Sequence, residues 1–414
     1  MKKCIKTYSE ILLCTLIAIF IGVIVGALDT LFGRVLLAIG DFRTAHVYYL
    51  VPFVSIGGVF ILFMYNKVSA PSLKGMTLIF NAGLRDKQEI PPLLIPLVMI
   101  ATWITHLFGG SAGREGVAVQ LGATVSYTLA RKYKLTKYLR IFLIVGMAAG
   151  FAGLFQTPIA ASFFAIEVLI AGSLQYSALL PVLAGAFTAS YTSHLLGLEK
   201  FSVAITTSFQ FSPSLAVKLV VIGICFGIVG GLFAHLLSLG KKYVGKWSAH
   251  PYLKIFIIGI ALSITLLALF GGRYCGLGTN LINASFTGKT IYTYDWLLKL
   301  VLTIITLSAG FQGGEVTPLF SIGASLGIVL AQLLGLPLEL TAALGYAAVF
   351  GSATNTLLAP IFIGAEVFGP SHILYFAVVC GISYVFNGNK TIYTSQQRYE
   401  YEPTTDTSSQ ESIN

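Results

Sequence analysis

Charged side chains are scarce in this chain: they make up 10% of its 414 residues, while 56% of the residues are hydrophobic. An ordinary soluble domain carries about 25% charged residues, so the composition excludes that class. Apolar runs near 11–33, 48–66, 215–238 and 253–270, among others, reach or approach the length of about 20 helical residues that crosses a bilayer core. Several further runs are shorter, which indicates half-helices. The sequence therefore predicts an all-α polytopic membrane protein.

Cysteine is also rare, and its five residues show neither metal-ligand nor disulfide-framework spacing, so we interpret them as packing residues. The sequence lacks a Walker loop, a metal-ligand cluster and a nucleophile with a nearby base. We therefore expect no enzymatic activity, no metal and no cofactor.

The basic residues that give the chain its net charge of +10 lie in short loops between apolar runs. In such loops they set the orientation of the chain in the membrane and do not indicate nucleic-acid binding. These loops can all face the cytoplasm if the first span runs outward. The first run, about 20 residues long, lacks a small-residue cleavage site, so we interpret it as a retained span. We expect a multi-pass protein in the lipid of the cell membrane with its N-terminus in the cytoplasm.

Composition divides the chain into five segments. We predict a cytoplasmic N-terminus at 1–10, a first membrane repeat at 11–200, a polar connection at 201–214, a second membrane repeat at 215–394 and a disordered cytoplasmic tail at 395–414.

The two long segments repeat one another. At an offset of 199 residues, Gly146-Met147-Ala148-Ala149 superposes on Gly345-Tyr346-Ala347-Ala348, and Glu167 superposes on Glu366. Nearby offsets relate further glycines: 201 takes Gly113 to Gly314 and Gly122 to Gly323, and 203 takes Gly75 to Gly278. Transporters with such repeats often place broken helices at the repeat interface, with helix N-termini aimed at an anion. We predict four such starts, near Gly75, Gly116, Val316 and before Tyr393.

Glu115 is the principal candidate residue, because it stands between glycines at a predicted helix start, where a carboxylate mimics a bound anion. A carboxylate that enters the anion path when charged and leaves it when protonated would couple protons to anions. The alternative is a helix cap with no role in transport. We expect Glu167 and Glu366, which are repeat-related, to bind backbone donors in a structural role.

Neighbouring residues suggest which groups line the path. Val117 would supply a free amide donor that a proline could not, Gly116 starts the helix, and the Thr317 hydroxyl can donate to an anion. Tyr393 can aim a phenolic donor at an inner site. Ordinary explanations remain open: packing for Val117, a helix cap for Thr317 and an interfacial anchor for Tyr393.

These signatures resemble the CLC family of chloride channels and proton-coupled anion antiporters over roughly residues 10–395. The resemblance rests on Gly113-Arg114-Glu115-Gly116-Val117, the stretch 273–279, the stretch 314–318 and Ile392-Tyr393. Val117 instead of proline and Met76 in Gly75-Met76-Thr77 instead of serine resemble the fluoride/proton antiporter branch. Val168 departs from the second of two adjacent glutamates in proton-coupled chloride members.

The resemblance implies a CLC-type fold of two inverted repeats with broken and re-entrant helices, assembled as a homodimer. It implies export of cytoplasmic fluoride in exchange for inward protons, with Glu115 as the gate and Met76 among the anion-binding residues. Gly75 and Phe80 would line the path, although a methionine or phenylalanine in an apolar run is otherwise ordinary core. Alternatives are a chloride-selective CLC exchanger or channel and, of another class, an organic-solute carrier or membrane scaffold that would not require Glu115.

Overall fold

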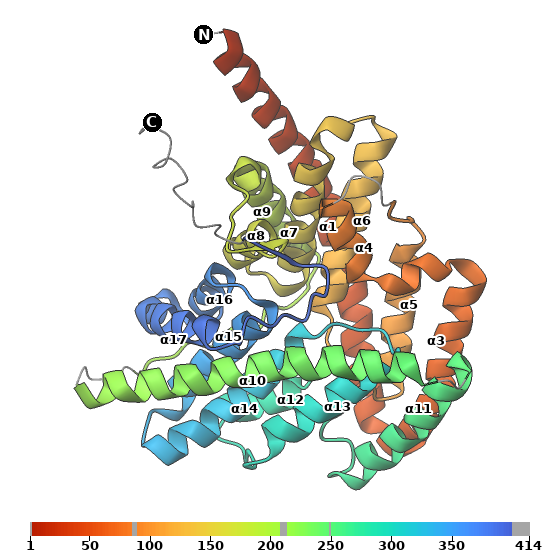
Figure 1. Cartoon of the computed structure of the whole chain (residues 1–414), viewed down its shortest axis with the longest axis vertical. Coiled ribbons are helices and arrows are strands. Elements are labelled where there is room, and N and C mark those ends of the chain that lie inside the picture. The colour runs from red at the N-terminus through yellow and green to blue at the C-terminus, as the bar shows by residue number, and fades with distance from the viewer. Residues whose placement is uncertain (1, 85–88, 208–212, 248–249, 400–414) are drawn as a thin grey trace, which may run out of the picture.

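The computed structural model describes residues 2–84, 89–207, 213–247 and 250–399, almost all of them helical or in short connections (Figure 1). The first half contains α1 (Lys2–Ala45), α2 (Val47–Leu50), η1 (Val51–Phe53), α3 (Val54–Val68), η2 (Ala70–Lys74), α4 (Met76–Leu84), α5 (Leu94–Leu107), α6 (Glu115–Lys132), η3 (Thr136–Tyr138), α7 (Leu139–Phe155), α8 (Pro158–Glu167), β1 (Ile170–Ala171), η4 (Tyr176–Ala178) and α9 (Leu179–Leu195). The second half contains α10 (Pro213–Lys246), α11 (Pro251–Ala268), α12 (Thr279–Phe286), α13 (Asp295–Ala309), α14 (Val316–Leu334), α15 (Leu338–Thr354), α16 (Leu358–Phe368), η5 (Pro370–His372), α17 (Ile373–Val385) and β2 (Gln397–Arg398).

Helix lengths confirm the predicted polytopic class. Among the described residues, six helical stretches are long and apolar enough to cross a membrane, and four further apolar helices have 10–17 residues. The helices α4 and α12 are shorter still, with nine and eight residues. A residue in an unusual conformation precedes each of them: Gly75 has φ +49° and Gly278 has φ +86°. Glycine adopts these angles without Cβ strain, so the chain can turn sharply into a half-helix.

The repeat seen in the sequence is visible in the packing of glycines. A Cβ on Gly122 of α6 would lie 2.1 Å from the carbonyl oxygen of Gly146 on α7. In the second half, a Cβ on Gly323 of α14 would lie 2.1 Å from the carbonyl oxygen of Gly345 on α15. Both helix pairs therefore cross with their backbones in contact, which only glycine permits at these positions.

The two repeats are inverted relative to each other. The start of α4 at Gly75 lines one cavity, and the equivalent start of α12 at Gly278 lines another. Pro251, at the start of α11, lines the first cavity, and Phe270, just beyond its end, lines the second. Equivalent helix starts therefore face opposite ends of a membrane-length helix. Figure 1 shows α10 as one long helix that runs across α12, α13 and α14.

Glu167 and Glu366 exchange helix caps between the repeats, as predicted. The Glu167 carboxylate accepts the amides of Leu357, Leu358 and Ala359 at the start of α16. The Glu366 carboxylate accepts the amide of Ile159 at 3.2 Å and that of Ala160 at 2.8 Å, at the start of α8. Each glutamate satisfies donors that a helix start leaves free.

The ends of the predicted segments differ in detail from the structure. The helix α10 begins at Pro213, inside the predicted connection, and β1 pairs in parallel with β2, which lies in the predicted tail. Residues 400–414 of that tail lie outside the described residues. The fourth predicted helix start is wrong, because the described residues around Tyr393 form turns and no helix.

Candidate anion pathway

The Glu115 side chain is fully buried, and its carboxylate lies against the start of the helix from the other repeat. Glu115 Oε2 accepts the backbone amide of Thr317, the second residue of α14, at 3.1 Å, and it also accepts the Thr317 hydroxyl. The amide of Arg114 donates to the same oxygen at 3.3 Å. An ionised carboxylate is therefore held as an anion would be held at a helix N-terminus.

A two-sided backbone bridge brings these residues together. The amide of Gly113 donates to the carbonyl of Gly314 at 2.5 Å, and the amide of Gly314 donates to the carbonyl of Gly113 at 2.8 Å. A Cβ on Gly113 would lie 2.8 Å from Cδ of Pro318. This crowding requires glycine, and the bridge aligns the starts of α6 and α14.

The second oxygen of Glu115 lacks a hydrogen-bond donor within the described part of the chain. Arg114 Nε lies 3.7 Å from this Oε1 atom, so the two side chains form an ion pair. Arg114 Nε and Nη1 are both buried, and neither has a hydrogen-bond acceptor among the described residues. The arginine contributes positive charge beside this oxygen.

The Val117 amide is not the free donor that the sequence predicts. It donates to the carbonyl of Arg114 at 3.1 Å, so the predicted free donor is wrong for this conformation. The helix begins at Glu115, one residue before the predicted start at Gly116, and this tightens the first turn. A role for Gly116 and Val117 in binding an anion stays a prediction.

Four of the predicted residues, Gly75, Met76, Phe80 and Tyr393, line one cavity of about 390 Å³. The Phe80 and Tyr393 rings stack there with centroids 4.9 Å apart and an interplanar angle of 26°. Glu115 and Thr317 are not among the residues that line this cavity. The predicted residues thus lie in two places. One is the cavity, and the other is the buried contact between the Glu115 carboxylate and the donors of Thr317, which we call the carboxylate seat.

Gln120 lies between the cavity and the seat. Its Nε2 donates to the carbonyl of Gly116 at 3.2 Å, whereas its buried Oε1 has no hydrogen-bond partner in the part of the chain that the structure describes. This Oε1 lies 3.0 Å from the position that a Cβ would take on Gly75. Gln120 therefore packs the start of α4 against α6 and presents an unsatisfied polar atom at the cavity wall.

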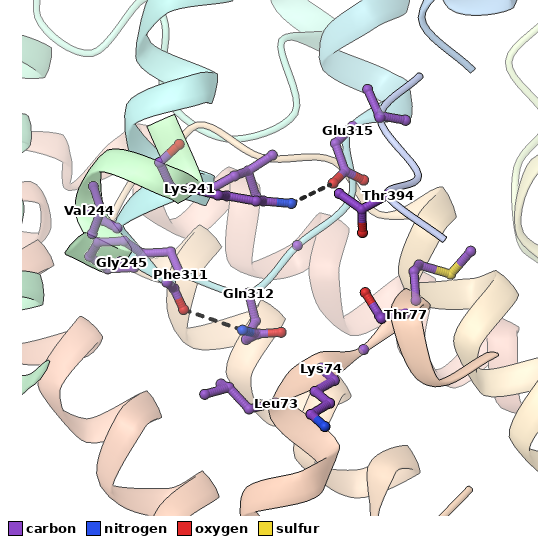
Figure 2. Close-up of a pocket in the computed structure, with 18 of the residues that line it drawn as sticks. Leu73, Lys74, Thr77, Lys241, Val244, Gly245, Phe311, Gln312, Glu315 and Thr394 are labelled. Atoms are coloured by element: carbon purple, nitrogen blue, oxygen red, sulfur yellow. Dashed lines mark hydrogen bonds and ion pairs between the residues drawn. The ribbon is translucent and has the colours of Figure 1, made fainter. Parts of the chain in front are cut away.

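Glu315 is a second carboxylate at the site, and the sequence reasoning assigned it no role. Its Oε2 lies 3.6 Å from the position of a Cβ on Gly116, the residue that follows Glu115. Its Oε1 forms an ion pair with Lys241 Nζ at 3.9 Å, and Figure 2 shows these two side chains facing each other in the cavity. The signal in the sequence was an acidic residue directly before a helix start, two residues from Thr317.

Comparison with known proteins shows to which family the chain belongs. The sequence profile of the voltage gated chloride channel family matches residues 57–388. The chain belongs to this family, the CLC family.

Individual CLC proteins are similar to most of the chain. A chloride/fluoride channel protein of Pseudomonas syringae pv. tomato is 35% identical over 386 residues, which cover 91% of this chain and 84% of the relative. A CLC-type fluoride/proton antiporter of known crystal structure is 52% identical, with a TM-score of 0.93 over 95% of this chain and 99% of that one. A slow cyanobacterial Cl⁻/H⁺ antiporter shares the fold, with a TM-score of 0.80 at 22% identity over 92% and 96% of the two chains.

The cavity and the carboxylate seat are two parts of one CLC protein. The chain is a multi-pass membrane protein of a transporter family, with two inverted repeats that meet at the Gly113–Gly314 bridge. The carboxylate seat lies at that bridge, and the cavity opens beside it.

Proposed function

We propose that this CLC protein is an antiporter that exports cytoplasmic fluoride in exchange for inward-moving protons. The observation that carries the proposal is the Glu115 carboxylate, which occupies the donors of Thr317 at the start of α14. The similarity to a CLC-type fluoride/proton antiporter supports the same activity.

The coupling follows from competition for one set of donors. A charged Glu115 occupies the start of α14, whereas a protonated Glu115 loses the charge that holds it there and yields the donors to an anion. Because the carboxylate must gain a proton before the anion enters, each anion passage is tied to a proton step. Uncoupled passage would require the anion and the carboxylate to share a buried site, which like charges disfavour.

Fluoride selectivity would arise at the cavity wall. Met76 offers a thioether, a weak acceptor without a strong donor, at the start of α4. Phe80 and Tyr393 offer ring edges with partial positive charge, which suit a small anion that enters partly dehydrated. Chloride, which a hydroxyl donor would favour here, gains little from this wall.

Glu315 supplies a route for the proton between Glu115 and the cavity. It lies beside Gly116, lines the cavity and pairs loosely with Lys241 at 3.9 Å. The side chain of Glu315 is 14% exposed, so it can take up a proton from water in the cavity. This assignment replaces the inner glutamate that other proton-coupled CLC proteins would have at Val168.

The direction of transport follows from the chemistry of fluoride. Hydrogen fluoride, a weak acid, crosses membranes as a neutral molecule and dissociates in the cytoplasm, where the trapped anion needs a driven exit. Lys74, Lys241 and Lys254 line the cavity, and the bias of such residues towards the cytoplasm supports a cytoplasmic position for it and for the N-terminus. We expect a homodimer in the cell membrane, with one pathway in each subunit.

The test is flux from liposomes that contain the purified protein and are loaded with fluoride or with chloride. Anion efflux is measured with an ion-selective electrode, and proton uptake is measured with a pH-sensitive dye inside the vesicles. Fluoride efflux that draws in protons, with much slower chloride efflux, supports the proposal. Equal rates for the two anions would favour a chloride-handling exchanger, and fluoride efflux without proton uptake would indicate a channel.

A further inference from the structure

The start of α12 is the counterpart of the start of α4, but the proposed function gives it no role. Gly278, which precedes α12, corresponds to Gly75 at an offset of 203 residues, and each has a positive φ. Within the described residues, no side chain caps the start of α12. Gly278 and Thr279 line a cavity of about 380 Å³ that is separate from the one that contains Met76.

An unsatisfied polar atom lies beside this helix start, as it does beside its counterpart. Ser321 Oγ is fully buried, has no hydrogen-bond partner among the residues that the structure describes, and lies 2.8 Å from the position of a Cβ on Gly278. Gln120 Oε1 has the same relation to Gly75, at 3.0 Å. The two residues are 201 positions apart, the same offset that relates Gly113 to Gly314. The pairing of a glycine-led helix start with a free polar atom is therefore a property of the repeat.

A buried ammonium group supplies positive charge at this place. Lys299 of α13 is fully buried, and its Cε lies 2.8 Å from the position of a Cβ on Gly278. Its Nζ donates to Gly276 O at 2.6 Å, Ser111 Oγ at 2.8 Å and Tyr274 O at 3.2 Å. Among the described residues, no carboxylate forms an ion pair with it. A buried cation without a counter-ion is costly, and a bound anion would relieve that cost.

The other charged side chains at this cavity do not form an ion pair with Lys299 in the described part of the chain. Arg273 pairs with Asp295 through Nη2 and Oδ2 at 2.7 Å, and hydrogen bonding to this carboxylate raises the pKa of the guanidinium. Arg43 and Asp41 also line the cavity, and the Arg43 Nη1 atom donates to the carbonyl of His106 at 3.3 Å. Lys299 therefore lies beside the helix start without a carboxylate partner in the described part of the chain.

The position of this helix start links it to the carboxylate seat. Ser321 follows Thr317 by one turn of α14, and residues four apart lie on the same face of a helix. Lys299 also bonds to Ser111, four residues before Glu115 in the loop that leads to α6. The cavity lies at the opposite end of α11 from the Met76 cavity, and this helix of 18 residues spans about 27 Å.

We propose that the start of α12 is a second anion site, in which the Ser321 hydroxyl and the first amides of α12 bind a small monovalent anion beside Lys299. The anion enters from the cavity lined by Gly278 and Thr279. A small monovalent anion fits this place because the hydroxyl and the backbone amides are hydrogen-bond donors, while Lys299, whose Nζ donates to three other groups, adds positive charge. Fluoride, the anion of the proposed function, is the probe used in the test. The proposal concerns binding alone and does not depend on proton coupling.

The test counts bound fluoride ions in the purified protein by isothermal titration calorimetry. We expect the wild type to bind two fluoride ions per subunit. Ser321→Ala should weaken one of the two by about tenfold, which corresponds to about 1.4 kcal/mol. Ser325→Ala is the matched control, because the Ser325 hydroxyl is buried in the same helix and donates to the carbonyl of Ser321 at 2.6 Å. Its isotherm should equal that of the wild type.

Lys299→Met provides a second variant that removes the charge and keeps much of the side-chain length. If it folds, it should lose the same site that Ser321→Ala weakens, and Ser321→Ala alone decides the matter if it does not fold. One bound fluoride in the wild type, or an unchanged isotherm for Ser321→Ala, would overturn the proposal. Proton-coupled fluoride efflux measured on the same preparation tests the proposed function separately, since it can be present with one bound ion or absent with two.

Discussion

Replacing Thr317 with valine tests whether the start of α14 holds the charged carboxylate. Valine has nearly the shape of threonine but lacks the hydroxyl that donates to Glu115 Oε2, while the Thr317 amide at 3.1 Å is retained. A hydrogen bond to a charged group contributes about 1.5–3 kcal/mol. Loss of this bond weakens the hold on the charged carboxylate, so fluoride efflux in Thr317→Val should persist to a higher pH than in the wild type, and the pH of half-maximal transport should rise.

The assay is the pH dependence of fluoride efflux from liposomes, with the same pH on both sides of the membrane. Thr341→Val is the matched control, because the buried Thr341 hydroxyl donates at 2.8 Å to the carbonyl of Pro337, the residue that precedes its own helix α15. That variant should keep the wild-type midpoint. An unchanged midpoint in Thr317→Val, or an equal rise in the control, would refute the reasoning.

Three further substitutions test the wall, the proton route and the packing. Met76→Ser adds a hydroxyl donor at the start of α4, so chloride efflux should rise about tenfold relative to fluoride; an unchanged ratio of initial rates would contradict the assigned selectivity. Glu315→Gln should stop proton uptake while calorimetry still detects fluoride binding, and proton uptake at the wild-type ratio would remove Glu315 from the route. Gly122→Ala forces a Cβ to within 2.1 Å of the Gly146 carbonyl oxygen, so it should destabilise the protein by at least about 1–3 kcal/mol and lower its melting temperature in detergent. Gly381→Ala, which meets nothing within 4 Å, is the control, and an equal loss there would contradict the packing argument.

The parts of the fold that the sequence predicts are those set by local chemistry. Gly75 and Val316 mark helix starts because a glycine turn or a proline in the first turn acts within a few residues. The repeat predicts the contacts of Gly122 and Gly323, and it identifies Glu167 and Glu366 as structural groups. It does so because residues at equivalent positions of the two repeats make equivalent contacts.

The parts that the sequence does not predict depend on contacts between the repeats. Glu115 lies at the start of its own helix α6, as predicted, but the donors that its carboxylate accepts include those of Thr317, 202 residues away in the other repeat. Glu315 meets Lys241 only because α10 passes the start of α14, and no local pattern encodes that approach. The amide of Val117 is already bonded because the first turn of α6 is tighter than the assumed one.

The central claim is that Glu115 carries the proton that is exchanged for fluoride, and proton movement in Glu115→Gln tests it most directly. Glutamine keeps the size of the side chain but cannot ionise. In liposomes with an outward fluoride gradient, the account predicts that wild-type protein takes up protons while fluoride leaves, and that Glu115→Gln takes up none. Proton uptake by the variant at the wild-type rate would contradict the account.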